Sequence, residues 1–428
     1  MYSLAMYLMT LGAFIGSLFS KKLRHQIKGQ AKTMFILHKN IKKTDRVVWV
    51  HAASLGEFEQ GRLLLEIIRR NHPEFKILLT FFSPSGYEVQ KDYAGADVIC
   101  YLPFDTPGNA ASFIRLAHPE IGLIIKYEFW ANYLMFAKLR KVKLYSVSSI
   151  FRPTQYFFKW YGNKTALKCF SHLFVQNEES RQLLSGIGIN NTTVVGDTRF
   201  DRVILIRKMA SDLPLVETFC NGQKTFIAGS SWGGDEEIYI PYFNEHKDWK
   251  LIIAPHLITG HHITEIRKLL EGRNVVLYSE VEANEFNREK GNIEGRDEKL
   301  RNADVLIIDC FGKLSSIYRY GDIALIGGGF NQSGIHNVPE AAVYGIPTIF
   351  GPNNQKFQEA QALLKLGGSF SFSDSDSFRQ LMDRFIAEPD AVAEAGKAAA
   401  GYIYSEAGAV KKCYEGILQD IRKQGEKN

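Results

Sequence analysis

Short apolar runs rich in β-branched residues alternate with helix-like segments along most of this 428-residue chain. Runs that are apolar throughout are typical of strands buried on both faces of a parallel sheet. The first series lies at 47–50, 77–80, 98–100, 121–125, 144–147, 173–175 and 193–195. The second series lies at 226–228, 251–253, 275–277, 305–308, 323–326 and 348–350. This alternation predicts an α/β fold with two doubly wound, Rossmann-like domains.

A less regular stretch at 202–223, which contains Pro214 and Asn221-Gly222, separates the two series. The length of the chain also exceeds what one ordinary core supports. The charged segment 279–302 has little apolar periodicity and is predicted to be a surface loop. We expect three parts: a hydrophobic anchor with its basic flank at 1–24, a first domain at 25–210, and a second domain with terminal helices at 211–428.

Residues 2–20 contain no charged side chain and lead directly into Lys21, Lys22 and Arg24. A membrane-spanning helix needs about 20 apolar residues, so a short anchor, an interfacial helix and a signal peptide are all open. The basic residues follow the apolar run, which argues against a cleaved signal and favours an uncleaved anchor on the cytoplasmic side. A soluble helix that packs on the first domain is the simpler alternative.

The five cysteines are scattered without disulfide or metal-ligand spacing, which favours a reducing compartment. The net charge of +6 includes a basic cluster between Lys21 and Lys43 that suits anionic lipid headgroups or nucleic acid. Asp374-Ser375-Asp376 is superficially a metal-binding motif, but it lies among serines ahead of a helical pattern. We interpret it as a helix cap, and we expect no metal and no cofactor.

The polar loop after the first run has Ser54-x-x-Glu57, the spacing of a capping box. In that interpretation Glu57 only satisfies backbone N–H groups at the start of a helix. Ligands of open α/β sheets bind beyond the carboxyl ends of the strands, where a partly desolvated carboxylate can act as a general base. The spacing leaves both roles open. Asp105 and Glu128 also follow strands and could line an acceptor pocket. Equally, Asp105 could cap a helix, and Glu128 could be a buried carboxylate paired with Lys126 or another basic residue.

The loop after the run at 323–326 begins with three glycines from Gly327 and leads into Asn337-Val338-Pro339-Glu340. Glycines allow a ligand close to the backbone, and a helix beginning near Asn337 would favour an anion. Glu340 either stabilises the first helical turn or accepts two hydroxyl groups of a ribose. Three more loops follow other strands, at Ser230-Ser231, Pro255-His256 and Phe311-Gly312-Lys313. Together the four loops favour a nucleotide site.

Several of these loops, in order along the chain, resemble motifs of the 3-deoxy-D-manno-octulosonic acid (Kdo) transferases. The similar segments are His-Ala-Ala-Ser-Leu-Gly-Glu at 51–57, Leu-Pro-Phe-Asp-Thr-Pro at 102–107, Glu-Phe-Trp-Ala-Asn at 128–132, Gly-Asp-Thr-Arg-Phe-Asp at 196–201, Gly-Ser-Ser at 229–231 and His-Asn-Val-Pro-Glu at 336–340, with Gly351-Pro352. The resemblance covers nearly the whole chain, including the apolar N-terminus and its basic flank.

The resemblance implies a GT-B glycosyltransferase with a cleft between two Rossmann-like domains. Enzymes of this family move Kdo from CMP-Kdo to a lipid A precursor (lipid IVA type) in lipopolysaccharide biosynthesis, at the cytoplasmic face of the cell inner membrane. It implies an inverting, metal-independent reaction with Glu57 as general base, and inner-membrane lipids rather than nucleic acid as partners. The implied contacts to the CMP of the donor are Pro255, His256, Phe311, Gly312, Lys313, Asn337, Val338, Pro339 and Glu340, with Ser230 and Ser231 as further donor contacts.

Three positions depart from the family pattern. His256 stands where an arginine is usual, Lys313 where an acidic residue is common, and Trp232 where a histidine is common. Two other classes of function are compatible with the loops. One is another GT-B enzyme, such as a heptosyltransferase or a sugar-nucleotide epimerase. The other is a membrane-attached nucleotide-binding protein without catalysis.

Overall fold

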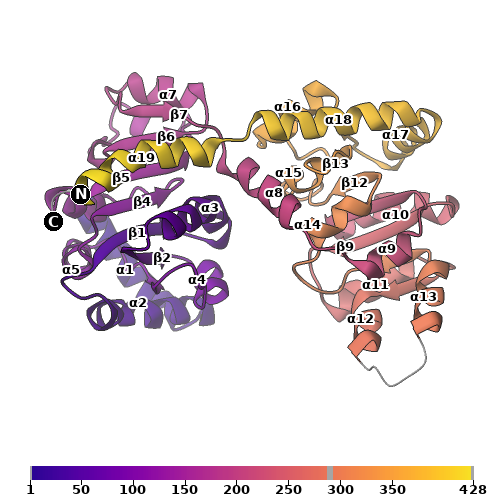
Figure 1. Cartoon of the computed structure of the whole chain (residues 1–428), viewed down its shortest axis with the longest axis horizontal. Helices are drawn as coiled ribbons and strands as arrows, with labels where there is room; N and C mark the ends of the chain where they lie inside the picture. The colour runs from indigo at the N-terminus through magenta and orange to yellow at the C-terminus, as the bar shows by residue number, and fades with distance from the viewer. Residues whose placement is uncertain (1, 287–292, 426–428) are drawn as a thin grey trace. The chain divides into compact units, whose positions relative to one another are not determined.

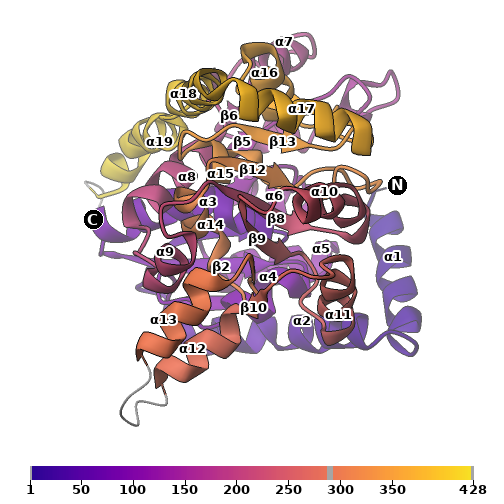
Figure 2. The ribbon, with the colours of Figure 1, turned by 90° about the vertical axis from the view of Figure 1, so that its right-hand side faces the viewer.

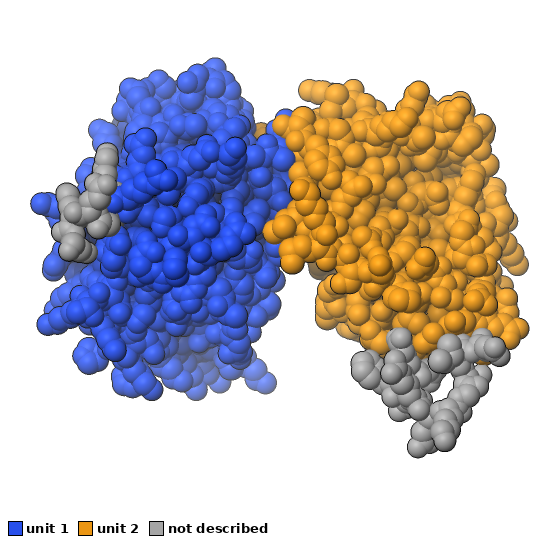
Figure 3. Space-filling model, viewed as in Figure 1, with its two compact units in different colours: residues 1–202, 406–428 blue, residues 203–405 orange. Residues whose placement is uncertain are grey.

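The computed structural model describes residues 2–286 and 293–425 (Figure 1). It divides into two compact units, residues 1–202 with 406–428 and residues 203–405, and each is described by itself (Figure 3). We predicted a boundary near residue 210 and placed the terminal residues in the second domain. In the structure, residues 406–428 belong to the first unit, because the last helix packs there.

The first unit is built on a seven-stranded sheet in the order β3-β2-β1-β4-β5-β6-β7. Every neighbouring pair of strands is parallel. All seven predicted runs are confirmed as strands: β1 (Arg46–Ala52), β2 (Phe75–Phe81), β3 (Val98–Tyr101), β4 (Ile121–Ile125), β5 (Lys143–Ser149), β6 (His172–Val175) and β7 (Thr192–Val194). The chain starts at β1, moves outward to β3, and returns to the other side of β1 at β4.

Helices cover both faces of this sheet, which explains why its strands are apolar throughout. One core joins the sheet to α2 (Lys21–Asn40), α5 (Pro107–Ala117), α6 (Ala131–Leu139) and α7 (Glu178–Ser185). The other core joins it to α3 (Leu55–Asn71) and α19 (Ala409–Gly425), which lies along β5 and α3 (Figure 1). The remaining elements are α4 (Pro84–Gln90), η1 (Tyr156–Phe158), η2 (Leu167–Cys169) and α8 (Thr198–Met209).

The predicted anchor forms α1 (Tyr2–Ser17), a helix of 16 residues that packs against α2. Its first turn is attached to the unit, because Tyr2 donates a hydrogen bond of 2.6 Å to Asp105 and Met6 is buried. Within residues 2–286 and 293–425, no helix is both long and apolar enough to cross a membrane.

The second unit is also built on a seven-stranded parallel sheet, in the order β10-β11-β9-β8-β12-β13-β14. The six predicted runs are strands, and β14 was not predicted because Ser-Phe-Ser has no apolar pattern. The bounds are β8 (Thr225–Ser231), β9 (Lys250–Pro255), β10 (Val275–Leu277), β11 (Val305–Ile307), β12 (Ile323–Ile326), β13 (Thr348–Phe350) and β14 (Ser369–Ser371).

The prediction of a surface loop at 279–302 is wrong for most of that segment. Its described residues form α12 (Tyr278–Phe286) and α13 (Ile293–Asn302), which lie side by side (Figure 2). Among the side chains of these helices that the structure describes, few are apolar and buried, Val281 and Leu300 among them, so the apolar periodicity that signals a helix is weak. Residues 287–292 lie outside the described residues.

Helices that we predicted near the end of the second unit are present as α17 (Ser375–Ala387) and α18 (Pro389–Ser405). At the start of α17, Asp374 accepts a hydrogen bond of 2.8 Å from the backbone N–H of Ser377, so the predicted capping role is confirmed. The other helices of this unit are α9 (Pro214–Cys220), α10 (Gly233–Glu245), α11 (Gly260–Leu269), α14 (Leu314–Ile317), η3 (Tyr318–Tyr320), α15 (Val338–Ala342) and α16 (Gln358–Leu366).

Candidate functional site

Each sheet has a point where the strand order reverses, and ligands of open α/β sheets bind beyond the carboxyl ends of strands at such points. In the first unit this point lies between β1 and β4, and in the second it lies between β8 and β12. Non-glycine residues with positive φ follow or end these strands: Lys126 at 58° after β4 and Ser230 at 54° in β8. Backbone strain of this kind concentrates at functional sites. Both points are therefore candidate ligand-binding sites, one in each unit.

Glu57 lies in the first turn of α3, just after β1. Its Oε2 accepts a hydrogen bond of 2.7 Å from the backbone N–H of Ala53. Ser54 is the N-cap residue, but its side chain makes no capping hydrogen bond. Neither hydrogen bond of the predicted capping box therefore forms among the described residues: the Ser54 side chain caps no N–H group, and Glu57 accepts from Ala53, one residue before the N-cap.

The environment of Glu57 favours a basic carboxylate. Burial raises the pKa of Glu57, and the negative charge of Glu128 raises it further. The N–H of Ala53 and the positive field of Lys126 act in the opposite direction but do not cancel the rise. A carboxylate whose pKa is raised toward neutrality accepts a proton more readily, which is what a general base requires.

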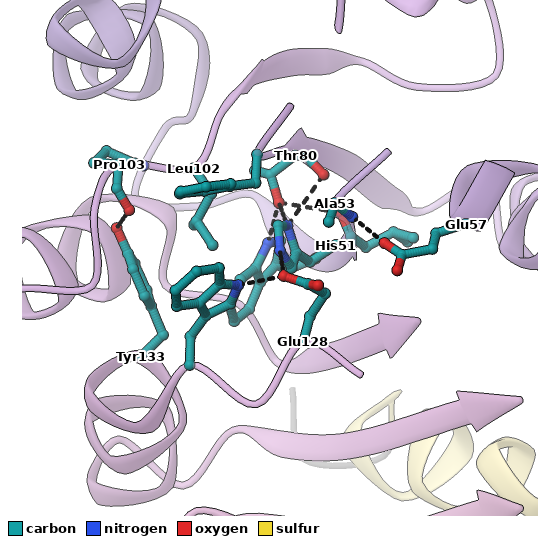
Figure 4. A network of polar contacts seen from close by, with 12 residues as sticks. His51, Ala53, Glu57, Thr80, Leu102, Pro103, Glu128 and Tyr133 are labelled. Carbon is teal, nitrogen blue, oxygen red and sulfur yellow. Dashed lines mark hydrogen bonds and ion pairs between the residues drawn. The ribbon is translucent and has the colours of Figure 1, made fainter. Parts of the chain in front are cut away.

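Glu128 follows β4 and belongs to a polar network that reaches into the sheet (Figure 4). The indole N–H of Trp130 donates to its Oε2 at 2.6 Å, and His51 Nε2 lies 3.6 Å from the same oxygen. His51 is fully buried, and its Nδ1 lies 2.9 Å from Thr80 Oγ1. Thr80 in turn accepts from the indole N–H of Trp49 at 2.8 Å. Buried, oriented neighbours thus hold Glu128 beside Glu57.

Asp105 does not cap the helix that follows it, because Thr106 is the N-cap of α5. Instead its carboxylate accepts from the backbone N–H groups of Asn132 and Tyr133, at 3.0 and 2.9 Å, and from Tyr2. Burial raises the pKa of Asp105 to about 6. Asp105 therefore joins α1 to the start of α6, a role that sequence patterns could not reveal because the partners are distant along the chain.

In the second unit, the glycine run after β12 packs against the protein's own backbone. A Cβ on Gly327 would meet the carbonyl oxygen of Ser230 at 2.2 Å, and one on Gly329 would meet the N of Gly351 at 2.4 Å. We predicted that these glycines admit a ligand. The structure explains Gly327 and Gly329 by close packing of the loop between β8 and the end of β13.

The helix predicted after this loop is α15, which has only five residues. Asn337 is its N-cap residue, but its side chain makes no capping hydrogen bond. Its Nδ2 donates instead to Glu340 Oε1 at 2.7 Å, and its buried Oδ1 has no hydrogen-bond partner in the described part of the chain. Asn337 therefore orients the carboxylate of Glu340 through its Nδ2.

Three aromatic rings meet where the loops after β8, β9 and β12 converge. The ring of His256 stacks on Trp232 with centroids 4.4 Å apart and on His336 at 4.5 Å. The indole N–H of Trp232 donates to His336 Nε2 at 3.1 Å. Two of the departures from the family pattern, Trp232 and His256, are thus in direct contact, and neither contact could be read from spacing.

The other predicted donor contacts have different surroundings. Ser231 is buried and donates to Glu236 at 2.8 Å, whereas Phe311 is 83% exposed. Lys313 donates to Glu282 at 3.1 Å and lies 5.3 Å from the ring of Tyr278, toward α12. Three of the predicted contacts, Pro255, Val338 and Pro339, have buried side chains, and Gly312 has a φ of 83°. The structure therefore brings Trp232, His256 and His336 together and pairs Asn337 with Glu340, whereas Lys313 pairs with Glu282 of α12.

Comparisons with known proteins point to one family. Residues 28–202 match the family described as 3-Deoxy-D-manno-octulosonic-acid transferase (kdotransferase). The 3-deoxy-D-manno-octulosonic acid transferase of Aquifex aeolicus (strain VF5) is 28% identical over 342 residues, covering 78% of this chain and 84% of that protein. The protein of the same name from Bordetella pertussis is 26% identical, covering 86% of this chain and 86% of that protein. The one from Rickettsia bellii (strain RML369-C) is 25% identical, covering 84% of this chain and 84% of that protein.

Two solved structures share the fold at low identity. UDP-GlcNAc 2-epimerase from Neisseria meningitidis, bound to UDP-GlcNAc, has a TM-score of 0.60 and 13% identity, covering 87% of this chain and 100% of that one. Anabaena HepE in complex with UDP has a TM-score of 0.52 and 10% identity, covering 88% and 100%. At such identities the likeness shows the fold alone.

Proposed function

This chain belongs to the family of Kdo transferases, which are glycosyltransferases, and on that premise we propose the reaction it catalyses. The reaction is transfer of Kdo from CMP-Kdo to a lipid A precursor of the lipid IVA type in lipopolysaccharide biosynthesis. The observation that supports this most is the match to Kdo transferases over 84 to 86% of their lengths. The second support is the presence of a suitable base and nucleotide-binding groups at the two switch points.

In this proposal the second unit binds the CMP of the donor. Glu340 accepts the two ribose hydroxyl groups, and Asn337 orients Glu340 through the 2.7 Å hydrogen bond. His256 and backbone N–H groups stabilise the charge that develops on the departing phosphate, so the proposal includes no metal ion.

The first unit binds the acceptor and supplies the base. A primary hydroxyl of the lipid A precursor is a weak nucleophile, so its proton must be taken as its oxygen attacks the anomeric carbon of Kdo. Glu57, with its raised pKa, is the residue we assign to this step. The oxygen–carbon bond forms as the bond to the CMP phosphate breaks, and a single displacement inverts the anomeric centre.

A donor panel tests this assignment against other glycosyltransferases of similar fold. The enzyme is incubated with a lipid A precursor and, separately, CMP-Kdo, an ADP-heptose and UDP-GlcNAc. We expect glycolipid product only with CMP-Kdo. Product from a heptose donor, or epimerisation of UDP-GlcNAc in place of transfer, would contradict the proposal.

The Glu128→Gln variant tests whether the charge of Glu128 raises the pKa of the proposed base, Glu57. The amide keeps an oxygen that can accept from Trp130 but removes the negative charge that raises the pKa of Glu57. The pKa of Glu57 should therefore fall. Because the base must be deprotonated, we expect the acidic limb of kcat/KM against pH to move to lower pH. An unchanged acidic limb would show that Glu128 does not act on Glu57.

We further propose that the α1–α2 layer attaches the enzyme to the cytoplasmic face of the cell inner membrane. The exposed apolar side chains of α1 and the turn after it include Leu4, Leu8, Leu11, Phe14, Leu18 and Phe19. The buried polar side chains of α2 dock it on the sheet, with Gln30 donating to the carbonyl of Leu102, while its basic side chains stay exposed. This pairing of apolar and basic surface suits an anionic lipid interface.

A double variant, Leu8→Glu with Leu11→Glu, tests the membrane proposal. Each leucine that inserts into the lipid interface contributes about 1.5–3 kcal/mol. We expect the affinity for vesicles containing anionic phospholipid to fall by at least about tenfold in a sedimentation assay. The control is Leu139→Glu, which alters an equally exposed leucine on α6. Equal binding by the double variant and the control would contradict the assignment to α1.

A further inference from the structure

The ring cluster Trp232–His256–His336 joins three loops of the second unit. Trp232 is the N-cap residue of α10, His256 follows β9, and His336 precedes α15. The backbone N–H of His256 donates to the carbonyl of Ser231 at 2.9 Å, which fixes the loop after β9 against the end of β8. The cluster therefore occupies one defined place where these three loops meet, and His336 directly precedes Asn337 in the chain.

Within the cluster, His336 is held in its neutral form. An indole N–H can only donate, so the nitrogen it meets, His336 Nε2, must be an acceptor. The single ring proton of His336 is then on Nδ1. Burial and the neighbouring His256 lower the pKa of His336 to about 4, in agreement with this geometry.

His256 is more exposed than His336, and in the described part of the chain no hydrogen bond engages its ring nitrogens. Partial burial lowers the pKa of His256, which favours the neutral ring in the unliganded protein. The titratable group that faces it from the loop before α15 is His336. On α10 the nearby carboxylates are already paired, Asp235 with the N–H groups of Trp232 and Gly328, and Glu236 with Ser231 and His262.

We propose that the Trp232–His256–His336 cluster binds the phosphate of the nucleotide donor, and that His256 takes up one proton from solvent when the phosphate binds. The anion stabilises the imidazolium directly, and the face of Trp232, 4.4 Å away, stabilises it by a cation–π interaction. The proton returns to solvent when CMP leaves. This inference rests on the proposed function, because it takes the ligand of the second unit to be a cytidine nucleotide.

Proton uptake on binding makes affinity depend on pH in a defined direction. Between the pKa of His256 in the free protein and its higher pKa in the complex, each unit of falling pH strengthens binding by up to about tenfold. Above the pKa of the complex, binding takes up no proton and does not depend on pH. The dependence ends below the pKa of His256 in the free protein, where the ring is already charged. A fixed cation at this position would bind the same anion without this dependence.

The test is calorimetric titration of the full chain with the methyl ester of CMP, a phosphodiester that does not itself titrate between pH 6.5 and 8. Buffers with different ionisation enthalpies report the number of protons taken up. We expect uptake approaching one proton near pH 7.5 and tighter binding toward pH 6.5. The His256→Arg variant should bind with no uptake.

The control variant is His261→Arg, which alters a largely exposed histidine of α11 and should keep the proton uptake. Binding without proton uptake by the unaltered protein, or unchanged uptake in His256→Arg, would overturn the inference but leave the proposed function standing. Failure of all three proteins to bind the nucleotide would overturn both.

Discussion

The Glu57→Gln variant is expected to lose about 10²- to 10⁴-fold in kcat for Kdo transfer while keeping its fold. Glutamine has the same shape, and its amide oxygen can still accept from the N–H of Ala53, so the start of α3 is preserved. What it cannot do is take the proton of the acceptor hydroxyl. Donor binding to the other unit should be unchanged, so the CMP affinity of the variant should equal that of the unaltered enzyme.

Two further variants separate this role from capping and from general charge effects. Ser54→Ala should change stability little, because Ser54 makes no capping hydrogen bond. Glu59→Gln alters a carboxylate on the same helix that is paired with Arg62 and Arg202, and it should keep turnover. Full turnover by Glu57→Gln would return Glu57 to a purely structural role.

The second large effect is expected from Glu340→Gln. A hydrogen bond to a charged group contributes about 1.5–3 kcal/mol, and the variant weakens two such bonds to the ribose as well as the one from Asn337. We therefore expect the Kd for CMP to rise by about 10- to 100-fold, measured by calorimetry. Because the ribose contacts are made before and during transfer, kcat at saturating donor should change much less than KM.

The matched control for Glu340 is Glu237→Gln, which alters an exposed carboxylate in the first half of α10. It removes the same charge from the same unit, so it accounts for long-range electrostatic effects on an anionic ligand. Equal CMP affinity in the two variants would show that Glu340 does not contact the nucleotide.

The fold could be predicted largely from the sequence because burial on both sheet faces leaves a strong local signal. Strands such as 121–125 are apolar throughout, and every predicted run became a strand. The apolar pattern is weak where a helix or strand buries few apolar side chains. Few of the described side chains of α12 and α13 are apolar and buried, and β14 pairs with β13 through its backbone. None of these three elements was therefore visible in the apolar pattern of the sequence.

The candidate site was predictable only in outline. Strand ends at a switch point gather by topology, so Glu57 and Glu128, or His256 and His336, could be expected near one another. Which of these residues contact one another is decided by the tertiary structure. The contacts of His51 with Thr80 and Glu128, and of Trp232 with His336, join residues far apart along the chain. In the glycine run, Gly327 and Gly329 are required by close approach of the protein's own backbone, a reason that the local pattern could not distinguish from a ligand.

The most direct test of the proposed function is a mass spectrum of the glycolipid formed from CMP-Kdo and a defined lipid A precursor. We predict that the precursor gains the mass of one or more Kdo residues, with one CMP released for each. The Glu57→Gln variant run in parallel should leave the precursor unchanged over the same time. An unmodified precursor in the presence of the unaltered enzyme and CMP-Kdo would contradict the proposal.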